Sequence, residues 1–160
     1  MQTGDLVKVI NRVLEAQSFD PNRLELEITE SYAHASELAL HALKSTGLAI
    51  YLDDFGTGYS SLAYLKKFPI DALKVDRSFI RDTPDDDDDA AIARAIIALG
   101  QALRLKVVAE GVETQEQLKF LIGEGCDEVK GFKFSKPLLF DDFVAWNSSF
   151  DCAGPGLIKL

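Results

Sequence analysis

Sulfur-containing residues and long apolar runs are scarce in this 160-residue chain. It has two cysteines, and Cys126 and Cys152 match neither a metal-binding spacing nor a Cys-X-X-Cys motif. Two such thiols argue against a disulfide framework and for reduced cysteines. No apolar run approaches the ~20 residues that cross a bilayer, and the polar first residues do not resemble a signal peptide. We therefore expect a cytoplasmic chain with no membrane segment.

Basic residues are also few relative to acidic ones. The chain has 17 lysines and arginines against 26 aspartates and glutamates, which gives a formal net charge of −9. Such a surface repels polyanions and argues against long nucleic acid as a partner. A small anionic ligand stays compatible with this charge if metal ions screen the site. A hydrophobic content of 47% is ordinary for a single globular domain that buries a core.

Hydrophobic periodicity predicts strands that alternate with helices. Short apolar or alternating segments indicate five strands, near residues 24–29, 48–53, 72–76, 106–110 and 128–134. Helical spacing predicts helices near residues 6–14, 34–46, 60–68, 92–103, from Thr114 to about Gly125, and 141–146. Thr114 and Gln117 fit a capping box at one of these helix starts.

This alternation predicts an α/β fold with a parallel sheet and crossover helices. Five units suit either an open doubly wound sheet or part of a (β/α)8 barrel. Acidic residues fall at the C-terminal ends of the predicted strands, where barrel enzymes place their chemistry. These residues are Glu27, Asp53, Asp54, Asp76 and Glu110.

Carboxylates gathered at one rim repel each other unless positive charge lies among them. Oxygen ligands of this kind suit Mg²⁺ or Mn²⁺. Lys74 interrupts an otherwise apolar strand, and a lysine there needs a partner or a function because burying its charge alone is costly. Two metal ions and a lysine beside a water molecule would suit hydrolysis of a phosphodiester. Acidic strand ends also occur as helix N-caps and solvated loops, so the pattern alone leaves both interpretations open.

Five ordered motifs then resemble the EAL domain family. They are Leu24-Glu25-Leu26-Glu27-Ile28-Thr29-Glu30-Ser31, Asp53-Asp54-Phe55-Gly56-Thr57-Gly58-Tyr59-Ser60-Ser61, Leu73-Lys74-Val75-Asp76-Arg77-Ser78-Phe79, Val107-Val108-Ala109-Glu110-Gly111-Val112-Glu113-Thr114 and Gly131-Phe132-Lys133-Phe134-Ser135-Lys136-Pro137. The resemblance spans about residues 5–146. It implies a TIM-like (β/α)8 barrel of which about five of eight strand–helix units are present. We expect residues 1–147 to form this partial domain and residues 148–160 to form a C-terminal tail.

The resemblance also implies an activity, which is hydrolysis of cyclic di-GMP to linear pGpG with two Mg²⁺ or Mn²⁺ ions. Carried over by motif, the metal ligands would be Glu27, Asp53, Asp54, Glu110 and Glu113, with Lys74 and Glu110 as catalytic residues. Lys74 would hold or polarise the attacking water. Glu30 would anchor the loop that follows Asp54. That loop is associated with dimer contacts in the family and comprises Phe55, Gly56, Thr57, Gly58, Tyr59, Ser60 and Ser61.

The sequence also departs from the family pattern at positions that bear on activity. The Glu-Ala-Leu motif that names the family and the Asn-bearing strand after it are absent from this sequence, and both supply metal ligands. Lys130 stands where the family usually has Gln, and Phe132 stands where Tyr is frequent; both fall on the substrate-binding side. We therefore expect an incomplete phosphodiesterase domain that is inactive alone. The alternatives are a degenerate domain that binds cyclic di-GMP or a protein without catalysis, and a fragment with no function of its own.

An unclosed sheet has two free edges, near residues 24–29 and 128–134. We also expect its inner face, built to fill a closed barrel, to expose apolar side chains to water. Both features predict a homodimer or other self-association through the open edges.

Overall fold

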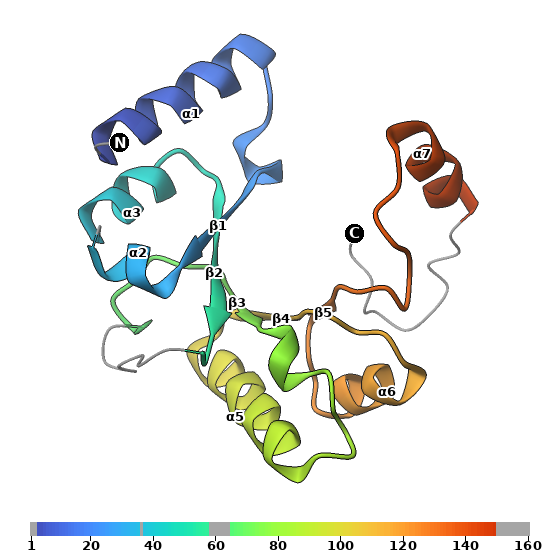
Figure 1. Cartoon of the computed structure of the whole chain (residues 1–160). Helices are drawn as coiled ribbons and strands as arrows, with labels where there is room; N and C mark the ends of the chain where they lie inside the picture. The colour runs from blue at the N-terminus through green and yellow to red at the C-terminus, as the bar shows by residue number, and fades with distance from the viewer. Residues whose placement is uncertain (1–2, 36, 58–64, 150–160) are drawn as a thin grey trace.

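The computed structural model describes residues 3–35, 37–57 and 65–149. Its centre is a parallel sheet with strand order β1-β2-β3-β4-β5, seen in Figure 1 as a curved row of strands. The strands are β1 (Glu25–Thr29), β2 (Ala49–Phe55), β3 (Ala72–Val75), β4 (Lys106–Ala109) and β5 (Glu128–Val129). Sequence order and spatial order coincide, so every connection is a crossover between neighbours.

The helices confirm the predicted alternation and revise its boundaries. They are α1 (Thr3–Gln17), α2 (Glu30–Ala35), α3 (Glu37–Lys44), α5 (Asp87–Leu103), α6 (Gln115–Gly123) and α7 (Phe140–Ser149), with short 3-10 turns at Pro21–Arg23 and Arg77–Phe79. The helix expected at 34–46 is two helices that flank residue 36, and most of the helix expected at 60–68 lies outside the described residues. The capping box is confirmed, because Thr114 accepts from the Gln117 backbone and the Gln117 side chain accepts from the Thr114 backbone.

The hydrophobic core lies on the outer face of the sheet, between the strands and the helices. Strand residues that alternate with the charged positions, such as Ile28, Leu52 and Val107, pack with helix residues such as Leu43 and Ile97. All five are buried. At about 1.5–3 kcal/mol for each buried large aliphatic side chain, this layer supplies most of the fold's stability.

The inner face of the sheet is mostly charged, which corrects the expectation of an exposed apolar face. Its buried apolar cluster is small and consists of Tyr51, Ala72 and Val108. Charged inward residues form ion pairs between neighbouring strands, as between Lys106 of β4 and Glu128 of β5 at 2.9 Å. An open sheet with such a face therefore exposes little apolar surface to water on that side.

Strand β5 ends at Val129 rather than at residue 134 as expected. After it, the chain crosses the loop that follows β4. The Val112 amide donates to the Lys130 carbonyl at 3.0 Å, and the Lys133 amide donates to the Val112 carbonyl at 2.9 Å. Gly131 permits this approach, because a Cβ there would collide with the backbone of Val112.

Exposed apolar side chains gather on α7 and the segment before it, while others, such as Val13 and Leu38, lie elsewhere. Those on α7 and the segment before it are Leu138, Leu139, Phe140, Phe143 and Val144. Figure 1 shows α7 standing apart from the other helices. A groove of about 600 Å³ lies between it and the sheet and is lined by residues of β5, of α7 and of the segment that joins them, among them Val129, Phe134 and Trp146.

Replacing Gly131 with alanine should destabilise the fold by about 1–3 kcal/mol, because the added methyl group overpacks a backbone crossing. Gly123→Ala is the matched control, since a Cβ at that helical glycine meets nothing within 4 Å and alanine favours helix by up to about 1 kcal/mol. Denaturant unfolding of both variants measures the difference. Equal stability of the two variants would show that the crossing is not tight.

Candidate active site

Lys74 is the centre of a cluster of charges at the C-terminal ends of the strands. Its ammonium lies 2.9 Å from a Glu27 oxygen, 2.8 Å from an Asp53 oxygen and 2.9 Å from a Glu110 oxygen. Only 3% of its side chain is exposed. Four neighbouring strands therefore each bring one charged residue to the same point, as the sequence predicted.

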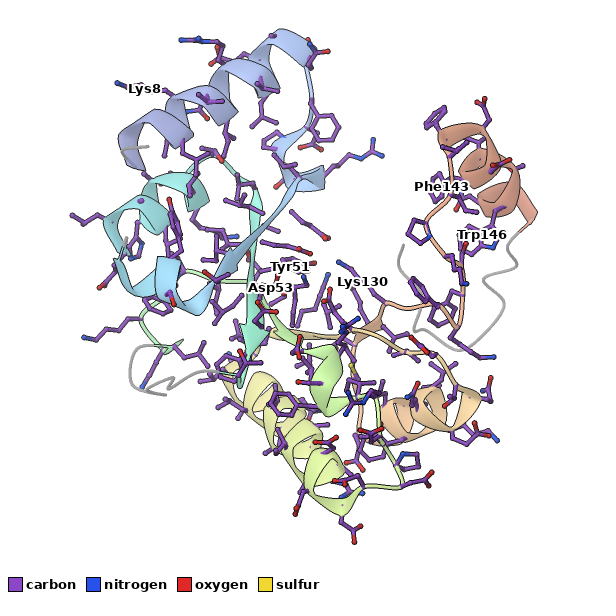
Figure 2. All side chains as sticks on the ribbon, viewed as in Figure 1. Lys8, Tyr51, Asp53, Lys130, Phe143 and Trp146 are labelled. Carbon is purple, nitrogen blue, oxygen red and sulfur yellow. The ribbon has the colours of Figure 1, made fainter. Side chains whose placement is uncertain are left out.

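Strand register explains why these residues meet. Glu27 pairs with Tyr51 and Tyr51 pairs with Ala72, and in a strand residues two apart point to the same face of the sheet. Glu27, Asp53 and Lys74 thus share the inner face, and Glu110 follows β4 directly. Figure 2 places Asp53 and Tyr51 on this face, with Lys130 near them.

Lys74 and Glu27 hold each other in their charged forms. Burial alone would lower the pKa of Lys74, but its hydrogen bonds to Asp53, Glu27 and Glu110 outweigh burial, and the pKa lies above its ordinary value. Burial alone would raise the pKa of Glu27, but the hydrogen bonds and charges of Lys74 and Lys130 leave it lowered. At neutral pH Lys74 is therefore an ammonium and Glu27 a carboxylate.

Asp54 lies beside the cluster in a strained backbone conformation. Its φ is +54°, a left-handed value that non-glycine residues seldom adopt and that concentrates at functional sites. The register of β2 against β3 shifts between Leu52 and Phe55, which marks a bulge here. Partial burial raises the pKa of Asp54, as do the negative charges of Asp53 and Asp76, against the opposing charge of Lys74. The rim thus has an excess of negative charge at this carboxyl.

Lys130 brings a second ammonium to the cluster from the far edge of the sheet. Its nitrogen lies 3.3 Å from the same Glu27 oxygen that bonds Lys74. The side chain of Lys130 is 45% exposed, in contrast to that of Lys74. Glu27 is therefore shared between a buried lysine and an accessible one.

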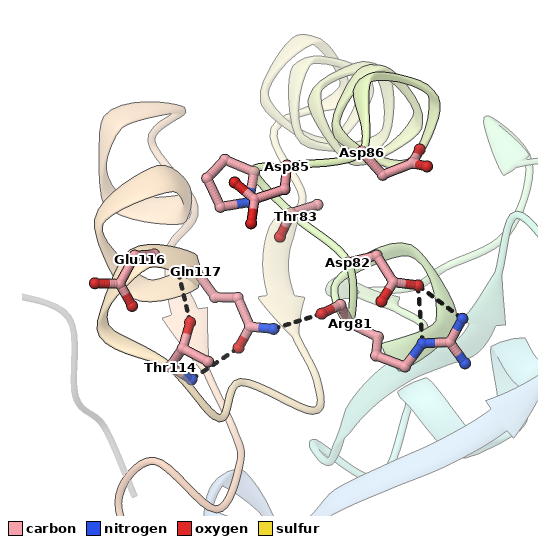
Figure 3. A pocket seen from close by; sticks show the side chains of 9 residues that line it. Arg81, Asp82, Thr83, Asp85, Asp86, Thr114, Glu116 and Gln117 are labelled. Carbon is pink, nitrogen blue, oxygen red and sulfur yellow. Dashed lines mark hydrogen bonds and ion pairs between the residues drawn. The ribbon is translucent and has the colours of Figure 1, made fainter.

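The loop that follows Glu110 is fixed by Gln117, a residue that the sequence marked only as a cap. Its buried side-chain amide accepts from the backbone amides of Glu113 and Thr114 and donates to the carbonyls of Ile80 and Arg81. Figure 3 shows the Gln117 contacts with Thr114 and Arg81 beside a pocket of about 440 Å³. This pocket is lined by Asp82, Asp85 and Asp86, and it contains none of the clustered rim residues.

Asp76 and the acidic run after it have structural roles. Asp76 accepts from the Ser78 amide as an N-cap, so it does not join the Lys74 cluster. Asp86 accepts from the amides of Asp88 and Asp89 at the start of α5. Acidic side chains in this position also interact favourably with the positive end of the helix dipole.

The cluster opens into a cleft of about 750 Å³. Glu110 and Glu113 line it together, as do Lys130 and Phe132. The Lys136 ammonium lies 5.9 Å from the centre of the Phe132 ring. Two of the expected metal-binding residues and both expected substrate-binding residues thus border one space, whereas Glu27, Asp53 and Asp54 are not among its lining residues. The side chain of Glu30 and all of Gly58, Tyr59, Ser60 and Ser61 lie outside what the structure describes.

The donor set fits a hard divalent cation in kind, since Glu27, Asp53 and Glu110 offer carboxylate oxygens. Yet among residues 3–35, 37–57 and 65–149 no three acidic, histidine or cysteine side chains are arranged to hold a metal ion together. In this structure the three carboxylates contact the Lys74 ammonium instead. A cation would bind here by reorienting carboxylates that are already adjacent.

A second polar layer lies below the rim, and sequence reasoning missed it. The Tyr51 hydroxyl donates to Glu25 at 2.9 Å, and Lys106 donates to the Tyr51 oxygen at 3.3 Å. Burial and the Glu25 bond raise the pKa of Tyr51 to about 12. The strand alternation was the signal that could have found this layer, since these residues occupy inward positions like those of the cluster.

Comparison with known proteins identifies the family of this chain. The sequence model of the EAL domain family matches residues 1–137. The chain belongs to the EAL domain family. A relative from Pseudomonas aeruginosa, named bifunctional diguanylate cyclase/cyclic di-GMP phosphodiesterase MucR, is 47% identical over 144 residues, which is 88% of this chain and 21% of MucR. The chain thus spans about a fifth of that relative's length.

Two solved EAL structures share the fold. The structure titled PaMucR phosphodiesterase, c-di-GMP complex, aligns with a TM-score of 0.83 and 47% identity over 86% of this chain and 57% of that one. A manganese and cyclic di-GMP complex of Klebsiella pneumoniae BlrP1 aligns with a TM-score of 0.76 and 34% identity over 83% of this chain and 35% of that one. The expected barrel-type α/β fold is confirmed. In the described part of this EAL chain, no helix is long and apolar enough to span a membrane.

Lys74→Met should destabilise the chain by about 2–4 kcal/mol, because it leaves three adjacent carboxylates without their shared cation. Mn²⁺ should recover part of the lost stability by taking the place of the ammonium. Thermal unfolding with and without Mn²⁺ measures both effects. Lys106→Met is the control, since it removes an inner-face lysine that has one carboxylate partner. Equal losses in the two variants, with no extra Mn²⁺ rescue for Lys74→Met, would contradict the central role of Lys74.

Proposed function

We propose that this chain carries the carboxylate and lysine part of a cyclic di-GMP phosphodiesterase site. The observation that carries this proposal is the convergence of Glu27, Asp53 and Glu110 on the Lys74 ammonium at one rim of a parallel sheet. The printed names of relatives, among them cyclic di-GMP phosphodiesterases and complexes with the nucleotide, support the choice of substrate. We place this activity in the cytoplasm, a reducing compartment that the free buried thiol of Cys126 suits.

In the proposed reaction, a water oxygen adds to phosphorus and the bond from phosphorus to a ribose 3′ oxygen breaks. That oxygen takes up a proton, and the product is linear pGpG. Lys74 stays protonated, because its pKa is raised by three carboxylate partners. It therefore does not remove the proton from the water, and it would orient the water and stabilise negative charge once one of its three carboxylates turns to a metal ion. The proton that leaves the water passes to a carboxylate or to solvent.

We propose that Glu27, Asp53, Asp54 and Glu110 would hold Mg²⁺ or Mn²⁺ here, with Glu113 on the border of the same cleft. Such ions polarise the phosphoryl oxygens and lower the pKa of a bound water. The Mn²⁺ complex of BlrP1 supports this choice of metal. Lys130 and Phe132 line the cleft, and we assign them to substrate, one to a phosphate and the other to a base.

The alternative is a domain that binds cyclic di-GMP without cutting it. A second ammonium at Glu27 favours this alternative, because Lys130 satisfies a carboxylate that a metal ion would otherwise use.

Binding and turnover of cyclic di-GMP in excess Mn²⁺ test these proposals. We expect Mn²⁺-dependent binding, with turnover on the order of a thousandfold or more below that of the MucR EAL domain, because catalytic groups act as a unit. Asp53→Asn should abolish the binding, whereas Asp141→Asn, an exposed position on α7, should leave it unchanged. Robust turnover would show that the site is sufficient as it stands, and binding that does not depend on Asp53 would refute the proposed site.

We also propose that the chain self-associates with a second copy. The two sheet edges at β1 and β5 and the apolar surface around Leu139 and Phe140 support this. Phe55, in the loop linked to dimer contacts, is buried in the core of its own chain, whereas Gly56 and Thr57 are exposed. Within the described part of the loop, a contact would therefore use Gly56 and Thr57.

Sedimentation at micromolar concentration should show an assembly larger than a monomer. Replacing Leu139 and Phe140 with serine should shift it toward monomer, since each exposed large apolar side chain that becomes buried contributes roughly 1.5–3 kcal/mol. Leu38→Ser is the control, because Leu38 is 89% exposed but lies on α3, away from this surface. A stable native monomer would end the proposal.

A further inference from the structure

Lys130 connects the two edges of the open sheet. It follows β5 directly and pairs with Glu27 in β1, 103 residues earlier in the chain. Among the ion pairs within the described residues, this one alone joins the two edge strands. The Glu27 oxygen that it reaches already accepts from Lys74 at 2.9 Å.

The two lysines on Glu27 differ in how freely they can leave. Lys74 is 3% exposed and bonds three carboxylates, so moving it away would leave buried charge uncompensated. Lys130 is 45% exposed and bonds Glu27 at the longer distance of 3.3 Å. Such an exposed pair contributes little stability, typically about 0–1 kcal/mol. Lys130 is therefore the exchangeable cation at this carboxylate.

We propose that Lys130 is a built-in competitor for the metal ion at Glu27. This inference rests on the proposed metal site. A divalent cation that binds Glu27 must displace the ammonium of Lys130 and also bears its repulsion, which weakens binding. The displaced side chain still borders the cleft that contains Phe132, where its charge can meet a ligand phosphate. Metal binding and the position of Lys130 are thus coupled through one carboxylate oxygen.

The test is Mn²⁺ titration by calorimetry on the native chain and on Lys130→Gln, Lys130→Arg and Lys133→Gln. Lys130→Gln should bind Mn²⁺ on the order of tenfold more tightly, as expected for removing a unit charge several ångströms from a divalent ion. Lys130→Arg keeps the charge and should bind like the native chain. Lys133→Gln makes the same change in net charge at an exposed lysine three residues along, and should stay within about twofold of native.

Equal Mn²⁺ affinity of Lys130→Gln and Lys133→Gln would overturn the inference and leave the proposed metal site standing. If none of the four proteins binds Mn²⁺ in a manner that Asp53→Asn abolishes, the metal site and the inference fall together. A second measurement uses the native chain alone, in case a variant does not fold. The NMR signal of the Lys130 side chain should shift as Mg²⁺ is added, and the shift should saturate with metal binding. A Lys130 signal that does not change at saturating Mg²⁺ would also overturn the inference.

Discussion

The fold of this EAL chain depends on one buried ammonium group. A charge as enclosed as that of Lys74 is tolerated only when partners compensate for its lost hydration, and its three partners come from three other strands or their ends. The sheet must therefore keep a register that brings Glu27, Asp53 and Glu110 to the same level. The sheet is also curved enough for Lys130 to reach Glu27 across its concave face.

Stability and chemistry lie on opposite faces of the sheet. Because the inner face is occupied by charged and polar groups, the outer face must supply nearly all of the apolar burial, and residues such as Leu52 and Val107 are fully enclosed there by helices. This division lets the rim hold strained and mutually repelling groups, such as Asp54 with its positive φ, without breaking the core. It also explains why α7, which lacks a partner layer among the described residues, presents apolar side chains to solvent.

Local patterns predicted the elements of the site better than its connections. Alternation in β1 and a lone lysine in β3 were enough to place Glu27 and Lys74 at one rim, because strand period and parallel topology determine both. The contact between Lys130 and Glu27 was not predictable, since it depends on how far the sheet curves between its two edges. The end of β5 was missed for a related reason: a backbone crossing with Val112, and not the local sequence, stops the strand. The charged residues of the inner face could be read from the alternation within single strands. The expectation of an apolar inner face came instead from the assumption that this face fills a closed barrel.

The central claim is that a divalent cation and the two lysines use the same carboxylates. A crystal structure of the chain grown with Mn²⁺, with the metal located by its anomalous scattering, tests this most directly. The account predicts an anomalous peak in contact with Glu27 and Asp53 at the rim, with the ammonium of Lys130 moved off Glu27. A peak confined to the acidic run at residues 85–89, with Lys74 and Lys130 still closed on Glu27, would contradict it.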